Sequence, residues 1–172
     1  MIKLIGSILV ITSCSALGFY FSDELKTRIN DLSEFKKLLI LFRGDIQYTN
    51  TPLPEAIQAL SKRHEGTYKV FLQNISNRLL DLSGSSFSEI WKDGIKNDLD
   101  HTSLAKEDYI LLNNLGDSIG YLDKNMQLNT LDLYLDQIEV TIDELNKTVK
   151  EKTHLYNSLG IMLGIFITIV LL

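Results

Sequence analysis

The sequence has little of what marks an enzyme, a disulfide scaffold or a nucleic-acid binder. Its 172 residues include one cysteine, which excludes a disulfide framework or a thiolate zinc cluster within the chain. It contains no G-x-x-x-x-G-K-[ST] loop, no H-E-x-x-H motif and no C-x-x-C motif. It also lacks a run of basic residues that would contact phosphates. These absences indicate a non-enzymatic protein without cofactor or metal.

The three histidines add no chemistry to this reading. His64, His101 and His154 lie far apart in polar surroundings, where solvated surface positions are expected. Asp98, Asp100 and His101 form a local polar cluster, but a metal site would need further ligands that the spacing does not indicate. We interpret the cluster as a loop or a helix cap.

Charge is nearly absent from both ends of the chain. Of the 39 charged residues, 38 lie between Asp23 and Lys152, and only Lys3 lies outside that span. Leu4–Ser22 and Leu155–Leu172 are uncharged runs of 19 and 18 residues. Each run is close to the roughly 20 residues that span a bilayer as a helix. The predicted organisation is a transmembrane helix at 1–22, a helical domain at 23–154 and a second transmembrane helix at 155–172.

Cationic residues flank the inner side of each apolar run. Lys26 and Arg28 follow the first run, and Lys147 and Lys150 precede the second. Because such flanks stay on the cytoplasmic side of a membrane, both runs place the central domain in the cytoplasm and both termini outside it.

Two other membrane arrangements remain open. Ile11-Thr12-Ser13-Cys14 loosely resembles the box at which bacterial lipoproteins are cut, and Cys14 would then carry the lipid. The apolar run continues beyond Cys14 to Phe21, which favours a retained helix. The other alternative is a two-anchor sensor or receptor with its helical bundle outside the cell, which we would expect to carry an output domain beyond the second anchor.

Apolar residues in the central domain recur every three or four positions, which predicts an all-α bundle of about six helices. The first long helix is expected to end at Thr51-Pro52-Leu53-Pro54, with Thr51 capping a helix that begins at Pro52. Ser86-x-x-Glu89 predicts a capping box, and Ser103 is a candidate cap. The expected shorter helices run from Pro52 to about Arg63, from Tyr68 to Leu82, from Ser86 through Trp91, and from Leu104 to Leu115.

The last helix carries a regular heptad seam. A heptad repeat keeps one row of side chains facing a partner helix. We favour packing against the first long helix of the same chain, antiparallel to it, and an intermolecular coiled coil is the alternative. The seam runs over Leu128–Val149 and consists of Leu128, Leu131, Leu135, Ile138, Ile142, Leu145 and Val149.

Two pairs of glycines need a structural reason. Inside a helix, Gly116 and Gly120 would each cost about 1 kcal/mol relative to alanine. They indicate either a turn, with Gly116 as a helix C-cap, or a close helix–helix contact. Gly160 and Gly164, four residues apart in the second apolar run, would let another helix approach closely. We expect this second pair to pack against the first apolar run or a membrane partner, although glycine is also simply common in membrane helices.

Several stretches, considered together, carry a family resemblance. They are Ile2-Lys3-Leu4-Ile5-Gly6, Gly18-Phe19-x-Phe21-Ser22, Thr51-Pro52-Leu53-x-Glu55-Ala56, Leu115-Gly116-x-x-x-Gly120 with Asp123 and Gln127, and Ser158-Leu159-Gly160. From end to end the chain resembles the stage III sporulation protein AB family of endospore-forming Firmicutes.

That family in turn resembles the cytoplasmic domain of type II secretion inner-membrane platform proteins, in which a Gly-Glu-x-Ser-Gly-x-Leu-Asp motif shapes a six-helix bundle. Here the motif reads Gly116-Asp117-Ser118-Ile119-Gly120-Tyr121-Leu122-Asp123, so aspartate replaces the glutamate and Ile119 replaces the serine. The resemblance implies these partner-binding or packing residues: Thr51, Pro52, Leu53, Glu55, Ala56, Gly116, Asp117, Gly120, Asp123 and Gln127.

The resemblance also implies a role. The chain would be a non-enzymatic platform or scaffold subunit of the secretion-like channel complex between mother cell and forespore. It would lie in the outer forespore membrane with its bundle in the mother-cell cytoplasm, and would dock a secretion-type ATPase to polytopic channel subunits. A homo-oligomer is compatible with this role, and no nucleic-acid partner is expected.

Overall fold

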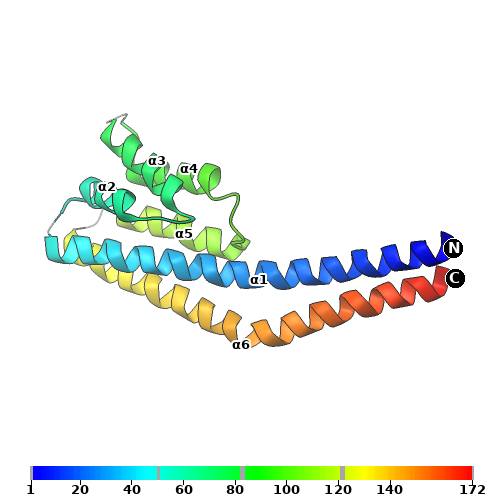
Figure 1. Cartoon of the computed structure of the whole chain (residues 1–172). Helices are drawn as coiled ribbons and strands as arrows, with labels where there is room; N and C mark the ends of the chain where they lie inside the picture. Colours follow the sequence, from blue (N-terminus) through cyan, green and yellow to red (C-terminus); the bar gives the residue numbers. More distant parts are fainter. Residues whose placement is uncertain (1, 50, 82–83, 121–122, 172) are drawn as a thin grey trace. The chain divides into compact units, whose positions relative to one another are not determined.

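The computed structural model describes residues 2–49, 51–81, 84–120 and 123–171, and the described chain is all-helical (Figure 1). The predicted all-α fold with six helices is confirmed over these residues. Among them, no helix combines the length and the apolar character needed to cross a membrane. The six helices are α1 (Ile2–Thr49), α2 (Leu53–Arg63), α3 (Lys69–Leu80), α4 (Phe87–Asp98), α5 (Lys106–Ile119) and α6 (Lys124–Leu171).

The chain divides into two compact units, and the long helices α1 and α6 contribute to both. Residues Asn30–Ile142 form the first, here called the bundle unit, which holds all of α2 to α5. Met1–Ile29 and Asp143–Leu172 form the second, here called the terminal unit. These limits follow packing, whereas the expected limits at residues 23 and 154 follow charge.

The core of the bundle unit is built around Trp91 of α4, whose side chain is 1% exposed. Its indole ring lies 5.0 Å from the ring of Phe71, 5.5 Å from that of Phe87 and 6.5 Å from that of Phe35, measured between centroids. Edge-on and tilted rings at these separations attract one another beyond the gain from burial alone. One tryptophan therefore joins α1, α3 and α4.

Within the bundle unit, α1 and α6 run antiparallel, as the sequence predicts. Arg43 Nη2 donates a hydrogen bond of 2.8 Å to Asp132 Oδ2, and Lys36 Nζ lies 2.9 Å from Glu139 Oε1. Arg43, the later of the two α1 residues, thus contacts Asp132, the earlier of the two α6 residues, as antiparallel helices require. Leu131 and Ile138 of the heptad seam are completely buried within the single chain. Packing of the seam inside the chain is confirmed for these two residues.

The caps predicted at Ser86 and Ser103 give one correct prediction and one error. The Ser86 capping box is present: Ser86 Oγ accepts from the Glu89 N–H at 3.3 Å, and Glu89 Oε2 accepts from the Ser86 N–H at 2.9 Å. The cap predicted at Ser103 is wrong, because α5 begins at Lys106. There the buried Asp108 carboxylate accepts from the Ala105 N–H at 2.8 Å and supplies the polar contact instead.

Candidate functional site

Two of the stretches that carry the resemblance, Thr51–Ala56 and Leu115–Gln127, lie at one end of the bundle unit. At this end α1 finishes and α2 begins, and α5 finishes and α6 begins (Figure 1). Lys124 Nζ of α6 donates a hydrogen bond of 3.1 Å to the Gln47 carbonyl of α1, which links the two junctions. We call this the junction end, and treat it as the candidate functional site.

Gly116 lies inside α5 and packs directly against the side chain of Trp91. Its Cβ, if present, would lie 2.7 Å from Trp91 Cγ, closer than real Cβ contacts come. The Trp91 Nε1–H donates a hydrogen bond of 2.8 Å to the Leu112 carbonyl, one turn earlier in α5. The interpretation of Gly116 as a helix C-cap is wrong, because α5 continues to Ile119. The alternative interpretation, a close helix–helix contact, is the arrangement observed.

Asp117 follows this glycine and points toward α4. Its Oδ1 atom lies 2.6 Å from Lys92 Nζ and also accepts a hydrogen bond from the Ser88 hydroxyl. The Lys92 ammonium, and after it the Ser88 hydroxyl, lowers the pKa of Asp117 below its usual value. Because about half of this side chain is exposed, solvent weakens the ion pair. The acid of the motif therefore joins α4 to α5 at the surface.

The end of α5 and the start of α6 are held by polar contacts. Gly120 ends α5 with ordinary helical angles, and its Cβ would lie 3.3 Å from Phe87 Cβ. Asp123 Oδ1 accepts from the Met126 N–H at 3.0 Å, as a helix cap does. Gln127 Nε2 donates to the Ile119 carbonyl at 3.2 Å. Tyr121 and Leu122, the remaining members of the motif, lie outside the described residues.

The Thr51–Ala56 stretch begins α2, but not as the sequence predicted. Pro52 occupies the N-cap position with φ −56° and ψ 154°, and α2 begins at Leu53. Thr51 is therefore not the cap. The first turn instead contains Pro54, whose missing N–H needs no acceptor there. Ala56 is completely buried, while Pro52 and Glu55 are exposed.

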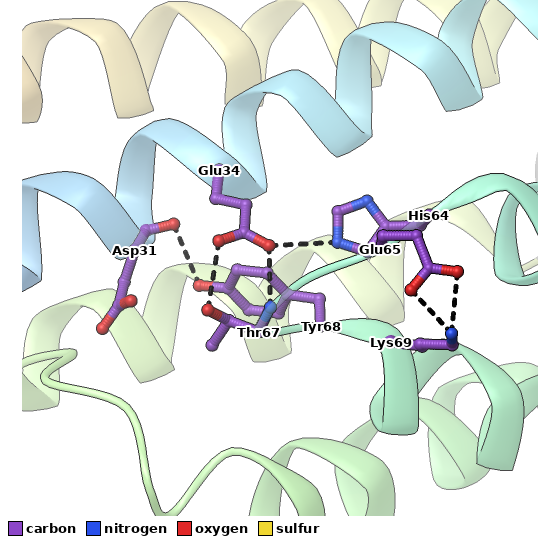
Figure 2. A network of polar contacts seen from close by, with 7 residues as sticks. All are labelled: Asp31, Glu34, His64, Glu65, Thr67, Tyr68 and Lys69. Atoms are coloured by element: carbon purple, nitrogen blue, oxygen red, sulfur yellow. Dashed lines mark hydrogen bonds and ion pairs between the residues drawn. The ribbon is translucent and has the colours of Figure 1, made fainter.

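A polar network at the other end of the bundle unit was not predicted. Glu34 of α1 accepts from the Thr67 N–H at 2.8 Å and from the Thr67 hydroxyl at 3.0 Å (Figure 2). Its Oε1 atom lies 3.2 Å from His64 Nε2. Gly66 has φ +143°, and a Cβ there would lie 3.0 Å from Glu34 Cδ. One carboxylate thus fixes the α2–α3 loop.

Two nearby groups of the network are buried. The Tyr68 hydroxyl donates to the Asp31 carbonyl at 3.1 Å (Figure 2), and Asp31 Oδ2 accepts from the Ser103 N–H at 2.8 Å. Burial raises the pKa of Tyr68 well above its usual value. Burial also raises the pKa of Asp31, which the Ser103 N–H partly offsets. The expectation that His64 is a solvated surface residue is wrong, because its side chain is 10% exposed and faces Glu34.

In the terminal unit, Gly18 of α1 lies against Gly160 of α6. A Cβ on Gly160 of α6 would lie 2.7 Å from the Cys14 carbonyl oxygen and 3.2 Å from the Gly18 Cα of α1. A Cβ on Gly18 would lie 2.6 Å from the Tyr156 carbonyl oxygen. The two helix backbones are therefore in direct contact at this crossing. Gly164 is also buried.

These contacts position helices and loops, and they assemble no metal centre in the described part of the chain. No group of three or more His, Cys, Asp and Glu side chains there could hold a metal ion. Asp100 and His101 of the predicted polar cluster are both exposed, and His101 Nδ1 lies 3.9 Å from Asp100 Oδ1.

The described residues define an all-helical bundle protein with close helix contacts at glycines, at Gly116 in the bundle unit and at Gly18 and Gly160 in the terminal unit. The chain belongs to the stage III sporulation protein AB family, whose sequence profile matches residues 3–172. The stage III sporulation protein AB of Bacillus subtilis strain 168 is 23% identical over 172 residues, which covers all of both chains. A solved structure of a stage III sporulation protein AB matches with a TM-score of 0.64 and 23% identity, over 72% of this chain and 97% of the other. At that identity, the structural likeness supports the fold.

Proposed function

We propose that this chain is a non-enzymatic platform subunit of the sporulation channel complex between mother cell and forespore. In this proposal the apolar ends of the sequence anchor it in the outer forespore membrane. The bundle unit lies in the mother-cell cytoplasm, where it docks a secretion-type ATPase to polytopic channel subunits. Membership of a sporulation family is the basis for the cellular process, and the remaining details are our proposal.

The observation that carries the docking role is that the two resemblance stretches of the bundle unit, Thr51–Ala56 and Leu115–Gln127, lie together at the junction end. Gly116 and Ala56 are buried and set the packing there. Glu55 and Asp123, from α2 and the start of α6, are exposed. A partner that docks at this end would meet an acidic surface on a rigid base. Such an arrangement suits a scaffold better than a catalyst.

The anchoring role is supported by the terminal unit. The contact between Gly18 and Gly160 pairs the two helices through small residues, and their large apolar side chains point outward. Phe19 and Phe166, for example, are 55% and 64% exposed. A large apolar surface in this position favours a lipid or protein environment over water.

The lipoprotein alternative fits the terminal unit less well. Lipidation would require cleavage before Cys14, yet the residues on both sides of that point lie in one helix, α1, and the apolar run continues beyond Cys14 to Phe21. The sensor alternative requires the bundle unit outside the cell, which the cationic inner flanks oppose.

The docking role is tested by capture of the sporulation ATPase on the full chain in lipid nanodiscs. We expect capture by the wild type and loss of capture with the double variant Glu55→Lys and Asp123→Lys. The matched control is Glu107→Lys, which reverses an exposed acid at the start of α5, away from the junction end. Absence of capture by the folded wild type would contradict the docking role.

A further inference from the structure

The outward side of α6 in the bundle unit carries a row of apolar side chains that takes no part in the core. Met126, Leu133 and Val140 are 53%, 54% and 57% exposed. Because they are spaced seven residues apart, they lie along one side of the helix. The buried seam residues Leu131 and Ile138 occupy a different side. The helix therefore has two apolar rows, and the bundle covers one of them.

This part of α6 is also acidic. Between Asn125 and Ile142 the sequence contains three carboxylates and no lysine, arginine or histidine. Two of the three, Asp132 and Glu139, are paired with cations of α1.

Asp136 lies three residues after Leu133 and four before Val140, so it borders the apolar row. It is exposed, and it makes no ion pair in the described part of the chain. We call Met126, Leu133, Asp136 and Val140 the α6 outer face.

We infer that the α6 outer face docks a cationic amphipathic helix from a partner protein. Apolar residues at heptad spacing match the side-chain rows of a second helix. The acidic border matches lysine or arginine beside the apolar row of that partner, and such complementarity raises the rate and selectivity of association. The inference deepens the proposed scaffold role and rests on it.

A second copy of this chain fits the α6 outer face poorly. Two copies anchored in one membrane would run parallel, and the same face on both would bring one Asp136 toward the other. Like charges at an interface disfavour association. The charge on this face therefore selects a basic partner over self-association.

The test uses the full chain in lipid nanodiscs and a synthetic helical peptide of three heptads, with leucine at one heptad position and lysines beside it. A twin peptide carries glutamate in place of each lysine. We expect the lysine peptide to bind and the glutamate twin to fail, as measured by fluorescence anisotropy. Leu133→Gln and Asp136→Lys should each weaken binding of the lysine peptide by about tenfold or more. The matched control is Ile110→Gln on α5, an equally exposed apolar residue that should leave binding unchanged.

Equal binding of the two peptides, or no loss with Leu133→Gln and Asp136→Lys, would overturn the inference. Self-association of the wild type that Leu133→Gln abolishes would also overturn it, in favour of a second copy. These failures leave the scaffold proposal intact if ATPase capture still depends on the junction end. If ATPase capture and cytoplasmic placement fail, the scaffold proposal falls on its own evidence.

Discussion

Gly116 of α5 lies directly against the indole of Trp91 in α4, with no room for a side chain between them. A Cβ on residue 116 would lie 2.7 Å from Trp91 Cγ, while Trp91 Nε1–H is held on the Leu112 carbonyl at 2.8 Å. The hydrogen bond prevents the ring from moving away freely. This contact joins the family motif to the aromatic core of the bundle unit.

The first prediction concerns the contact between Gly116 and Trp91. Gly116→Ala should lower the free energy of unfolding by about 2 kcal/mol or more, because the added methyl overpacks a filled core. Chemical denaturation of the full chain measures the change.

Gly44→Ala is the matched control for this prediction. Gly44 is also inside a helix, but a Cβ there meets nothing within 4 Å. This variant should be more stable than the wild type by about 0.5–1 kcal/mol, because alanine favours helix. Equal effects of the two substitutions would contradict the role of Trp91.

The second prediction concerns the loop held by Glu34. Glu34→Ala removes the acceptor for the Thr67 N–H and the Thr67 hydroxyl, and the contact with His64. We expect a loss of about 1–3 kcal/mol and faster hydrogen exchange at the Thr67 amide, because these donors lose a charged acceptor. Glu144→Ala, at an exposed acid of α6, should change neither quantity. Unchanged exchange at Thr67 would show that Glu34 does not hold the loop.

The third prediction concerns pH. Burial raises the pKa of Asp31 above its unfolded value near 3.8, so the folded state binds the proton more tightly than the unfolded state. Asp31 therefore reduces stability as the pH rises from that value through its raised folded pKa. Asp31→Asn removes this titration, and its amide oxygen can still accept from the Ser103 N–H.

The stability of Asp31→Asn minus that of the wild type should increase as the pH rises above about 4, because only the wild type must ionise a buried carboxyl. Urea unfolding at several pH values measures this difference, in which the other acids cancel. A difference independent of pH would contradict the shift.

The fourth prediction concerns the terminal unit. The rings of Phe21 and Tyr156 have centroids 6.2 Å apart, so a short bifunctional maleimide should bridge cysteines in their places within one chain. With Cys14→Ala, the pair Phe21→Cys and Tyr156→Cys should cross-link efficiently. Adding Gly160→Leu should reduce the yield severalfold, because leucine cannot fit against the Gly18 backbone. Cross-linking unchanged by leucine would contradict the close crossing, and the yield is read from electrophoretic mobility.

The sequence predicts features that depend on neighbouring residues better than those that depend on distant ones. The Ser86–Glu89 capping box spans three residues, and it was predicted correctly. The close contact at Gly116 is made with Trp91, 25 positions earlier. The glycine alone therefore indicates a close contact but not which residue makes it. Ser103 does not cap α5, which begins three residues later, and its N–H is instead bonded to Asp31, which lies far away in the sequence.

The Glu34 network shows the same limit for polar residues. Glu34 lies 30 positions before His64, and no periodicity of the sequence relates the two. A solvated histidine and a buried one that faces a carboxylate have similar local sequences. The heptad seam was easier to interpret, because regular spacing itself indicates a buried row.

The central claim is that the bundle unit faces the cytoplasm between two anchored ends. The most direct test labels single cysteines with a membrane-impermeant maleimide in intact cells, in a Cys14→Ala background. Ser85→Cys puts a cysteine at an exposed position of the bundle unit, and Asn146→Cys puts one at an exposed position of the terminal unit. A third cysteine, added after Leu172, reports on the C-terminus. We expect labelling of the added C-terminal cysteine in intact cells and labelling of the other two only after lysis. Labelling of Ser85→Cys before lysis would contradict it.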